Sequence, residues 1–362
     1  MKKTSKILII FTIIMCNIFA FEFLFFEKTA YAMNYNNSTS EIVMDVCSNR
    51  VLYSKNASEK KYMASTTKIL TAITIIENCN LSDIVEVTKQ SIGIEGSSIY
   101  LEEGEKLSVK ELLFGLMLRS GNDCAETLAL YCSKSIKNFA DLMNETAKKI
   151  GAKSSNFVNP HGLHDDNHYT TAYDLALISC YAMKNKDFRE IVGTQKVKIP
   201  FSTQNTVRLL INKNKMLSSF VGATGIKTGF TKKAGRCLVS SVVRNGMELV
   251  SVVLNSPNMF ERSKELLTNA FNEYEVKKIV DCNNVIDFID IDKSSNKCPI
   301  YIKNDIILPI SKDEENDIKI NYNYEKKLDF GTAKDTNIGQ IEIYIKNNLI
   351  FIEKIYTMLL AK

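Results

Sequence analysis

The sequence of 362 residues predicts a mixed α/β fold of the α+β kind, in which helices flank an antiparallel sheet and a small all-β domain follows. Residues 106–190 carry apolar side chains at helical spacing. Strand-like segments lie on either side, at residues 40–53 and 226–254, and isoleucine alternates with polar residues from residue 275 onward. We therefore expect one domain at residues 33–274 and a β-rich domain at residues 275–362, with residues 1–32 removed.

The first domain is expected to begin with a β-hairpin and a buried helix. Residues 40–53 alternate apolar and polar side chains around a turn at residues 47–50. Residues 67–77 are apolar on nearly every side, which predicts a helix inside the core. Further helices are expected where apolar residues recur every three or four positions, at residues 109–118, 124–130, 171–182 and 263–274.

The remaining strands follow from β-type patterns. Strands are expected at residues 226–229, 236–244 and 248–254, with Asn245-Gly246 as a strong hairpin turn between the last two. The composition changes near residue 275, beyond which neither arginine nor histidine occurs. In this last part we expect strands at residues 286–291, 300–307, 318–322, 341–345 and 349–352.

Composition excludes several classes of protein. The formal net charge is only +5 and no long run of like charges occurs, so we expect no nucleic-acid partner. The hydrophobic fraction of 45% is that of an ordinary folded protein and argues against disorder. Nine cysteines are too sparse for a disulfide scaffold, and the absence of Cys-x-x-Cys removes the zinc-ribbon spacing. We expect no cofactor.

The N-terminus has the parts of a secretory signal peptide. Lys2, Lys3 and Lys6 precede an apolar run, and Ala30-Tyr31-Ala32 is a typical cleavage site. The alternative is an uncleaved membrane anchor, although Asn17 and Glu22 interrupt the run. We expect cleavage after Ala32 and an exported protein, located at the cell wall or the outer face of the cytoplasmic membrane.

The motif Ser65-Thr66-Thr67-Lys68 contains a candidate nucleophile and base. At the start of a helix, Ser65 and Lys68 share one face, and a serine hydroxyl needs a neighbouring base to become nucleophilic. Burial or a second cation lowers the pKa of a lysine enough for it to act as that base. Ser-x-x-Lys also occurs at residues 58–61 and 294–297, but only the copy at Ser65 opens a long apolar helix.

Two more motifs offer polar groups. Ser120-Gly121-Asn122 lies between two expected helices, where its plain interpretation is a capped turn. Lys227-Thr228-Gly229 lies on an expected strand and offers a cation and a hydroxyl to an anion, whereas a solvated lysine on an edge strand is the plain alternative. Gly229 interrupts the strand pattern, which often marks the close approach of a ligand or backbone.

Together, the order and setting of these motifs resemble the active-site set of penicillin-recognising serine enzymes. Over residues 41–274 the chain resembles the low-molecular-weight penicillin-binding proteins, the serine-type D-alanyl-D-alanine carboxypeptidases. Gly121 stands where β-lactamases usually carry Asp, which is typical of the carboxypeptidase branch. The resemblance implies a fold like that of β-lactamases and penicillin-binding proteins, and it extends to other stretches: residues 51–53, 64–71, 159–163, 171–174 and 234–239.

The resemblance also implies catalytic roles. Ser65 would attack the carbonyl between the two terminal D-alanines, and Lys68 would take its proton. Ser120 would help to pass that proton to the leaving D-alanine. Water would then release the acyl-enzyme.

Substrate-binding roles are implied in the same way. Asn122 would hold the substrate backbone, and Lys227 and Thr228 would bind the terminal carboxylate. Gly229 and Phe230 of the same strand would also contact the substrate. The backbone N–H groups of Ser65 and Phe230 would form the oxyanion hole.

A histidine cluster provides a competing hypothesis. His161, His164 and His168 surround Asp165 and Asp166, and such residues can ligate zinc. Pro160 and Gly162 indicate a loop, however, and the spacing differs from the helical His-Glu-x-x-His motif. We therefore expect no metal.

The sequence thus predicts a hydrolase that removes the terminal D-alanine from peptidoglycan stem peptides through a Ser65 acyl-enzyme and that β-lactams acylate. The expected partners are stem peptides ending in D-Ala-D-Ala, β-lactam inhibitors and, peripherally, the membrane. Two alternatives remain. One is a β-lactamase, for which no deacylating glutamate can be identified from the sequence, and the other is a catalytically poor wall-binding scaffold with the same fold.

Overall fold

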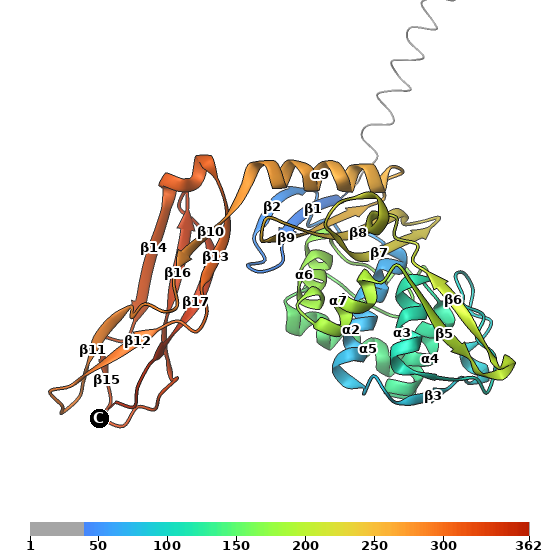
Figure 1. Ribbon diagram of the computed structural model, residues 1–362, viewed down its shortest axis with the longest axis horizontal. Coiled ribbons are helices and arrows are strands. Elements are labelled where there is room, and N and C mark those ends of the chain that lie inside the picture. Colours follow the sequence, from blue (N-terminus) through green and yellow to red (C-terminus); the bar gives the residue numbers. More distant parts are fainter. Residues whose placement is uncertain (1–39, 362) are drawn as a thin grey trace, which may run out of the picture.

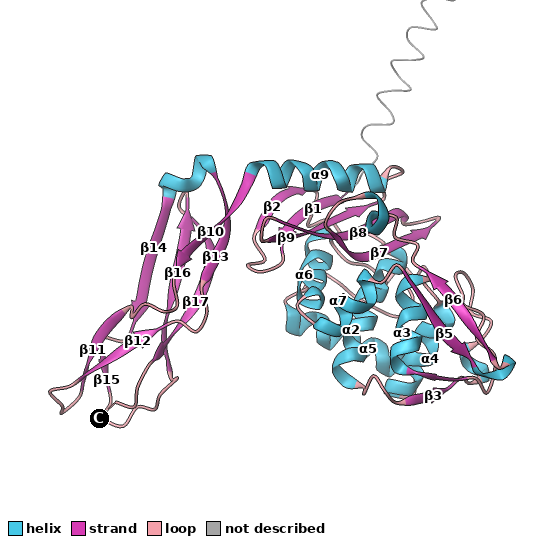
Figure 2. Cartoon of the chain, viewed as in Figure 1, coloured by secondary structure: helices cyan, strands magenta, loops and turns pink. Residues whose placement is uncertain are grey.

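The computed structural model describes residues 40–361, so the expected signal peptide at residues 1–32 lies outside the described residues. Two units follow one another along the chain (Figure 1). The first combines helices and strands, and the second consists almost entirely of strands (Figure 2). The predicted order of an α+β domain followed by an all-β domain is confirmed.

A five-stranded antiparallel sheet forms the frame of the first domain. Its strands are ordered β2-β1-β9-β8-β7, so the beginning and the end of the domain lie side by side in one sheet. The turn Asn245-Gly246 joins β8 to β9, as its sequence predicts. The strands are β1 (Ser40–Asp45), β2 (Val51–Lys55), β7 (Ala223–Thr231), β8 (Gly235–Arg244) and β9 (Met247–Leu254).

Helices cover both faces of this sheet (Figure 2). On one face, α9 (Met259–Glu273) packs leucine and alanine side chains against strand residues such as Val242 and Val253. On the other face, a larger core surrounds α2 (Lys68–Asn78), whose first eight residues are all buried. The remaining helices are α3 (Val109–Leu118), α4 (Asn122–Ser133), α5 (Ile136–Ile150), α6 (Ala172–Met183), α7 (Lys186–Gly193) and the short α8 (Met216–Ser219).

Two small antiparallel pairs of strands were not predicted. One pairs β5 (Lys196–Phe201) with β6 (Thr206–Ile211), and the other pairs β3 (Ile84–Glu86) with β4 (Lys106–Ser108). On β6, Val207, Leu209 and Ile211 are more than half exposed, whereas Leu210 of the same strand and Ile199 of β5 are buried in the core. The β5–β6 hairpin is therefore recognised by the pairing of its two strands and not by a hydrophobic pattern.

The second domain contains a six-stranded sheet in the order β14-β16-β17-β12-β11-β15 and a separate β10–β13 pair. Two expectations at its start need correction. The helix expected to reach residue 274 ends at Glu273, and the strand expected at residues 300–307 is two strands separated by a turn. The strands are β10 (Tyr274–Val280), β11 (Asp287–Ile291), β12 (Lys297–Tyr301), β13 (Ile306–Ser311), β14 (Ile318–Tyr324), β15 (Lys327–Leu328), β16 (Asn337–Ile345) and β17 (Asn348–Thr357).

Arg50 joins the two domains. It lies just before β2, donates to the backbone oxygen of Pro309 on β13 and pairs with Glu314. Its guanidinium also lies over the ring of Tyr274, 5.4 Å from the centroid, where the chain passes from one domain to the other. Over residues 40–361, no helix combines the length and the apolarity needed to cross a bilayer.

Candidate active site

Ser65 lies on a tight turn that opens the buried helix α2. The turn, η1 (Ala64–Thr67), is a 3₁₀-helix, and Ala64 has a positive φ of 50°. Gly162 packs directly against this turn with a φ of 85°, and a Cβ at Gly162 would collide with the carbonyl oxygen of Ala64. Glycine is therefore required at residue 162, where the loop of residues 159–163 presses on the segment that carries Ser65.

Lys68, one turn after Ser65, is completely buried and has three polar partners. Its Nζ lies 3.2 Å from Ser65 Oγ, 2.7 Å from Asn122 Oδ1 and 2.6 Å from the backbone oxygen of His161. These partners come from three separate segments of the chain. The predicted pairing of Ser65 with Lys68 is present in the structure, and Asn122 joins it.

The surroundings of Lys68 favour the uncharged amine. Burial lowers the pKa of Lys68 well below its ordinary value, and the positive charge of Lys227 lowers it further. A neutral amine has two N–H donors and one lone pair. Because Asn122 Oδ1 and the oxygen of His161 accept the two donors, the lone pair is left for the hydroxyl of Ser65. Lys68 can therefore take the proton of Ser65 without losing another hydrogen bond.

Ser120 and Asn122 differ in their contacts with the catalytic pair Ser65 and Lys68. Ser120 is buried in the connection between α3 and α4, with a positive φ of 64°. Within residues 40–361, its hydroxyl forms no hydrogen bond with Ser65 or Lys68. Asn122 is the first residue of α4 rather than a loop residue, and besides contacting Lys68 its amide donates to the backbone oxygen of Glu95. The structure thus brings the side chain of Asn122 into contact with Lys68, whereas Ser120 is buried two residues earlier in the chain without such a contact.

Strand β7 supplies the third motif at the edge of the sheet. Lys227 is almost fully buried, which excludes the solvated-lysine interpretation, and its Nζ donates to the backbone oxygen of Thr228 at 3.0 Å. A Cβ at Gly229 would lie 3.0 Å from both Met63 O and Ser65 N, so the strand passes very close to the nucleophile turn. The Phe230 side chain is exposed.

The protonation state of Lys227 depends on whether an anion is bound beside it. Burial, reinforced by the charge of Lys213, lowers the pKa of Lys227 to about 7. An anion placed beside Lys227 would favour the protonated form and draw a proton onto it. This strand is therefore suited to bind a carboxylate, as the sequence motif predicts.

Two contributors to the site were missed. Lys213, in the loop after β6, donates to Ser97 Oγ at 2.9 Å, and its charge contributes to lowering the pKa values of both Lys68 and Lys227. Nothing in its local sequence marks it. His161 contributes its backbone oxygen, which accepts a hydrogen bond from Lys68. No side-chain pattern reveals this role, although residues 159–163 are among the stretches that resemble the family.

The three histidines do not converge on one point. The ring of His161 is hydrogen-bonded to Glu126, and the ring of His168 to Thr67. His164 is partly exposed and lies 3.4 Å from Asp166. Within residues 40–361, the one group of three potential metal ligands is Asp281, Cys282 and Asp305, in the other domain. The arrangement of the rings gives no support to the zinc hypothesis.

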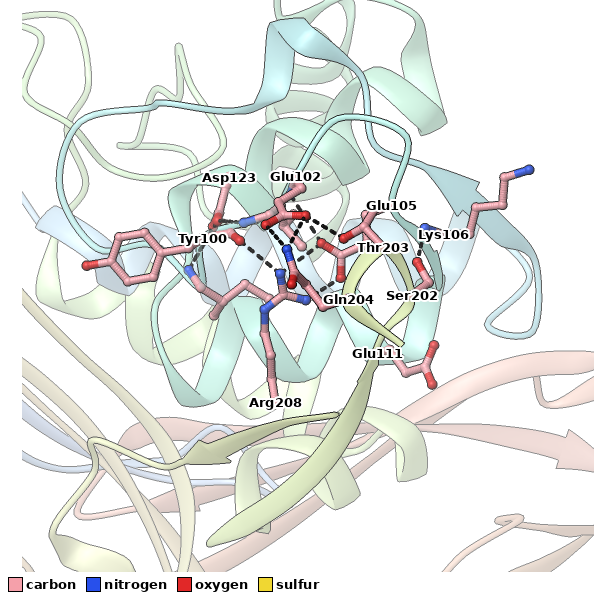
Figure 3. Close-up of polar contacts among 12 residues, drawn as sticks. Tyr100, Glu102, Glu105, Lys106, Glu111, Asp123, Ser202, Thr203, Gln204 and Arg208 are labelled. Atoms are coloured by element: carbon pink, nitrogen blue, oxygen red, sulfur yellow. Dashed lines mark hydrogen bonds and ion pairs between the residues drawn. The ribbon is translucent and has the colours of Figure 1, made fainter. Parts of the chain in front are cut away.

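A polar cluster that includes Asp123, the residue after Asn122, fixes the loop of residues 99–105 (Figure 3). The carboxylate of Asp123 accepts hydrogen bonds from the backbone of Ile99 and Leu101, which holds that loop against the start of α4. Arg208, on β6, pairs with the fully buried Glu105, and its Nη2 donates to Tyr100 O at 2.8 Å. The β5–β6 hairpin thereby braces the loop of residues 99–105 (Figure 3).

Comparison with known proteins identifies the family. Residues 27–258 match the family described as D-alanyl-D-alanine carboxypeptidase, also called peptidase S11. This chain belongs to that family. Residues 274–359 match a second family, the C-terminal domain of penicillin-binding protein 5. The predicted family and the predicted fold are both confirmed.

Several relatives cover most of this D-alanyl-D-alanine carboxypeptidase. The chain is 30% identical to the carboxypeptidase DacF of Bacillus subtilis over 87% of its own length and 86% of DacF. It is 35% identical to DacC of Escherichia coli over 71% of its length and 68% of DacC. The crystal structure of penicillin-binding protein 5 from Haemophilus influenzae superposes with a TM-score of 0.77 at 26% identity, covering 90% of this chain and 97% of that one.

Proposed function

We propose that this serine-type D-alanyl-D-alanine carboxypeptidase acts through a covalent Ser65 acyl-enzyme. The observation that carries this proposal is the position of Lys68, a buried amine with a lowered pKa, 3.2 Å from Ser65 Oγ. A serine hydroxyl beside such a base is an activated nucleophile. The substrate would be a peptidoglycan stem that ends in D-Ala-D-Ala, and a β-lactam would acylate the same hydroxyl.

Binding would begin at β7. The terminal carboxylate would lie beside Lys227 and Thr228, and its negative charge would keep Lys227 protonated. The Asn122 side chain would hold the peptide backbone on the opposite side. The scissile carbonyl would then lie near Ser65 N and the backbone of Phe230, which can donate to the developing oxyanion.

In both acylation and deacylation, Lys68 would accept a proton and then pass it on. In acylation, Ser65 Oγ bonds to the carbonyl carbon and its proton moves to Lys68 Nζ. The C–N bond to the terminal D-alanine then breaks, and that proton leaves with the amine. Ser120, which is buried two residues before Asn122, would help to pass the proton to the amine. In deacylation, a water oxygen bonds to the ester carbon while one of the water protons moves to Lys68 Nζ. The bond between that carbon and Ser65 Oγ then breaks, and Lys68 passes the proton to Ser65 Oγ, which releases the shortened peptide as its carboxylic acid.

The location of the enzyme is part of the proposal. An exported enzyme would meet peptidoglycan at the cell wall or the outer face of the cytoplasmic membrane, in agreement with the signal-peptide pattern of residues 1–32. Peripheral contact with the membrane is supported by exposed Phe330, Leu359 and Leu360 near the end of the second domain. Sedimentation with anionic lipid vesicles tests this contact, and a chain that stays in the supernatant would contradict it.

The mass of the intact protein after incubation with benzylpenicillin tests the mechanism. Wild type is expected to gain one drug mass, and Ser65→Ala is expected to gain none. Wild type should also release D-alanine from a D-Ala-D-Ala peptide. Rapid drug consumption without an adduct would instead indicate a β-lactamase. A protein with neither adduct nor D-alanine release would be a scaffold of the same fold.

A further inference from the structure

A cationic cavity lies next to the segment that leads into Ser65. It has a volume of about 400 Å³, and its walls come from the residues before η1, the turn after β7 and the loop before α6. Three lysines and two tyrosines line it together with one acid: Lys60, Lys61, Lys233, Tyr62, Tyr169 and Asp166. None of these residues takes part in the catalytic steps described above.

The cavity lies within reach of an extended peptide bound at Ser65. Lys227, at the carboxylate position, and Gly229, against the nucleophile turn, lie on β7, and Lys233 follows in the turn after this strand, at the cavity. Tyr62 precedes Ser65 by three residues, so their Cα atoms are at most about 11 Å apart. An extended peptide advances about 3.3 Å per residue, so its third residue before the scissile bond reaches roughly 10 Å from Ser65.

The charges in the cavity favour an anion. Lys61 is paired with Glu59 at 2.6 Å, and Asp166 accepts a hydrogen bond from the Tyr62 hydroxyl at 3.1 Å. Lys60 lies over the ring of Tyr169, 4.3 Å from the centroid, and among the described residues no carboxylate forms an ion pair with it. Within residues 40–361, Lys233 forms no ion pair.

We propose that this cavity binds a carboxylate carried by the acyl part of the donor peptide, two to three residues before the scissile bond. The proposal rests on the proposed function, because it extends the same substrate beyond Ser65. Lys60 and Lys233 supply the positive charge, and the rings of Tyr62 and Tyr169 supply apolar walls for the methylene groups that carry the carboxylate. The enzyme therefore prefers acyl donors with an anionic residue at this position.

The test compares two donors that differ by one group. One is acetyl-γ-D-glutamyl-(Nε-acetyl)-L-lysyl-D-alanyl-D-alanine, with a free α-carboxylate on the glutamyl residue. The other carries a carboxamide at that position and is otherwise identical. Wild type is expected to show a kcat/KM for D-alanine release about three- to tenfold higher with the carboxylate, and added NaCl is expected to reduce this difference.

Two lysine variants test whether the preference for the carboxylate donor comes from the cavity. Lys233→Gln is expected to lower kcat/KM about three- to tenfold for the carboxylate donor and to leave the amide donor unchanged. Lys232→Gln is the matched control, because Lys232 is an exposed neighbour that does not line the cavity. Acylation by benzylpenicillin, which lacks the distal residue, should be the same in both variants.

The outcomes separate the two proposals. If wild type releases D-alanine from both donors with equal kcat/KM, or if Lys233→Gln affects both donors equally, the carboxylate role of the cavity is overturned and the proposed function stands. If neither donor releases D-alanine and no penicillin adduct forms, the proposed function fails, and this inference fails with it.

Discussion

Acidification is expected to destabilise the first domain through one buried histidine. The His168 ring lies 2.8 Å from Thr67 Oγ1 through Nε2, and the backbone N–H of Val158 donates to its Nδ1 at 3.0 Å. Nδ1 is therefore an acceptor, and a second ring proton would oppose the Val158 N–H. Burial lowers the pKa of His168 from near 6.5 to about 3.

The direction and size of this change in stability follow from the difference between the pKa values of His168 in the folded and unfolded chain. Because the folded pKa lies below the unfolded one, the unfolded chain binds the proton first, and stability falls as the pH drops from 6.5 toward 3. Between pH 7 and pH 5 this single group removes about 2 kcal/mol. For a domain of this size that corresponds to a fall in Tm of about 4–8 °C.

Scanning calorimetry of the full chain at pH 7, 6 and 5 measures this effect while separating the two domains. His168→Gln lowers Tm at every pH, but its first domain should lose about 4–8 °C less than wild type between pH 7 and pH 5. His164→Gln, which removes a partly exposed histidine, should keep the wild-type pH dependence. An equal fall in Tm for wild type and His168→Gln would refute the reasoning.

Three further predictions concern the site and its supports. Because the pKa of Lys227 is about 7, KM for a D-Ala-D-Ala peptide should rise toward tenfold per pH unit above neutrality; steady-state kinetics from pH 6 to 9 would contradict this if KM stayed flat. Arg208→Ala leaves the buried Glu105 unpaired and should cost about 3–5 kcal/mol in urea unfolding, whereas the double variant Arg208→Met with Glu105→Gln should recover much of the loss. Gly229→Ala should slow penicillin acylation about 10- to 100-fold by pushing β7 away from Ser65, and an unchanged rate would show that the strand can yield.

Much of the fold could be predicted because its determinants are local. Periodic apolar residues mark α3 at the observed bounds and place α6 to within one residue. The strands β7, β8 and β9 follow from alternation and from one Asn-Gly turn. The β5–β6 hairpin was not predicted because Val207, Leu209 and Ile211 face solvent and obscure the apolar alternation of β6. Its ion pair from Arg208 to Glu105 joins residues about 100 positions apart in the chain, which no local pattern reveals.

The sequence by itself determined the reactive groups and their order along the chain. Ser65 and Lys68 are one helical turn apart, so any helix that begins there places them together. Only the tertiary structure decided which form Lys68 adopts, because its burial and its partners Asn122 and His161 come from segments more than 50 residues away. The tertiary structure alone also decided that Lys213 lies near Lys227 and that the residues around Lys233 form a cavity. Local spacing fixes neighbours along a helix or strand, whereas a pKa or a binding cavity depends on what packing brings together from distant parts of the chain.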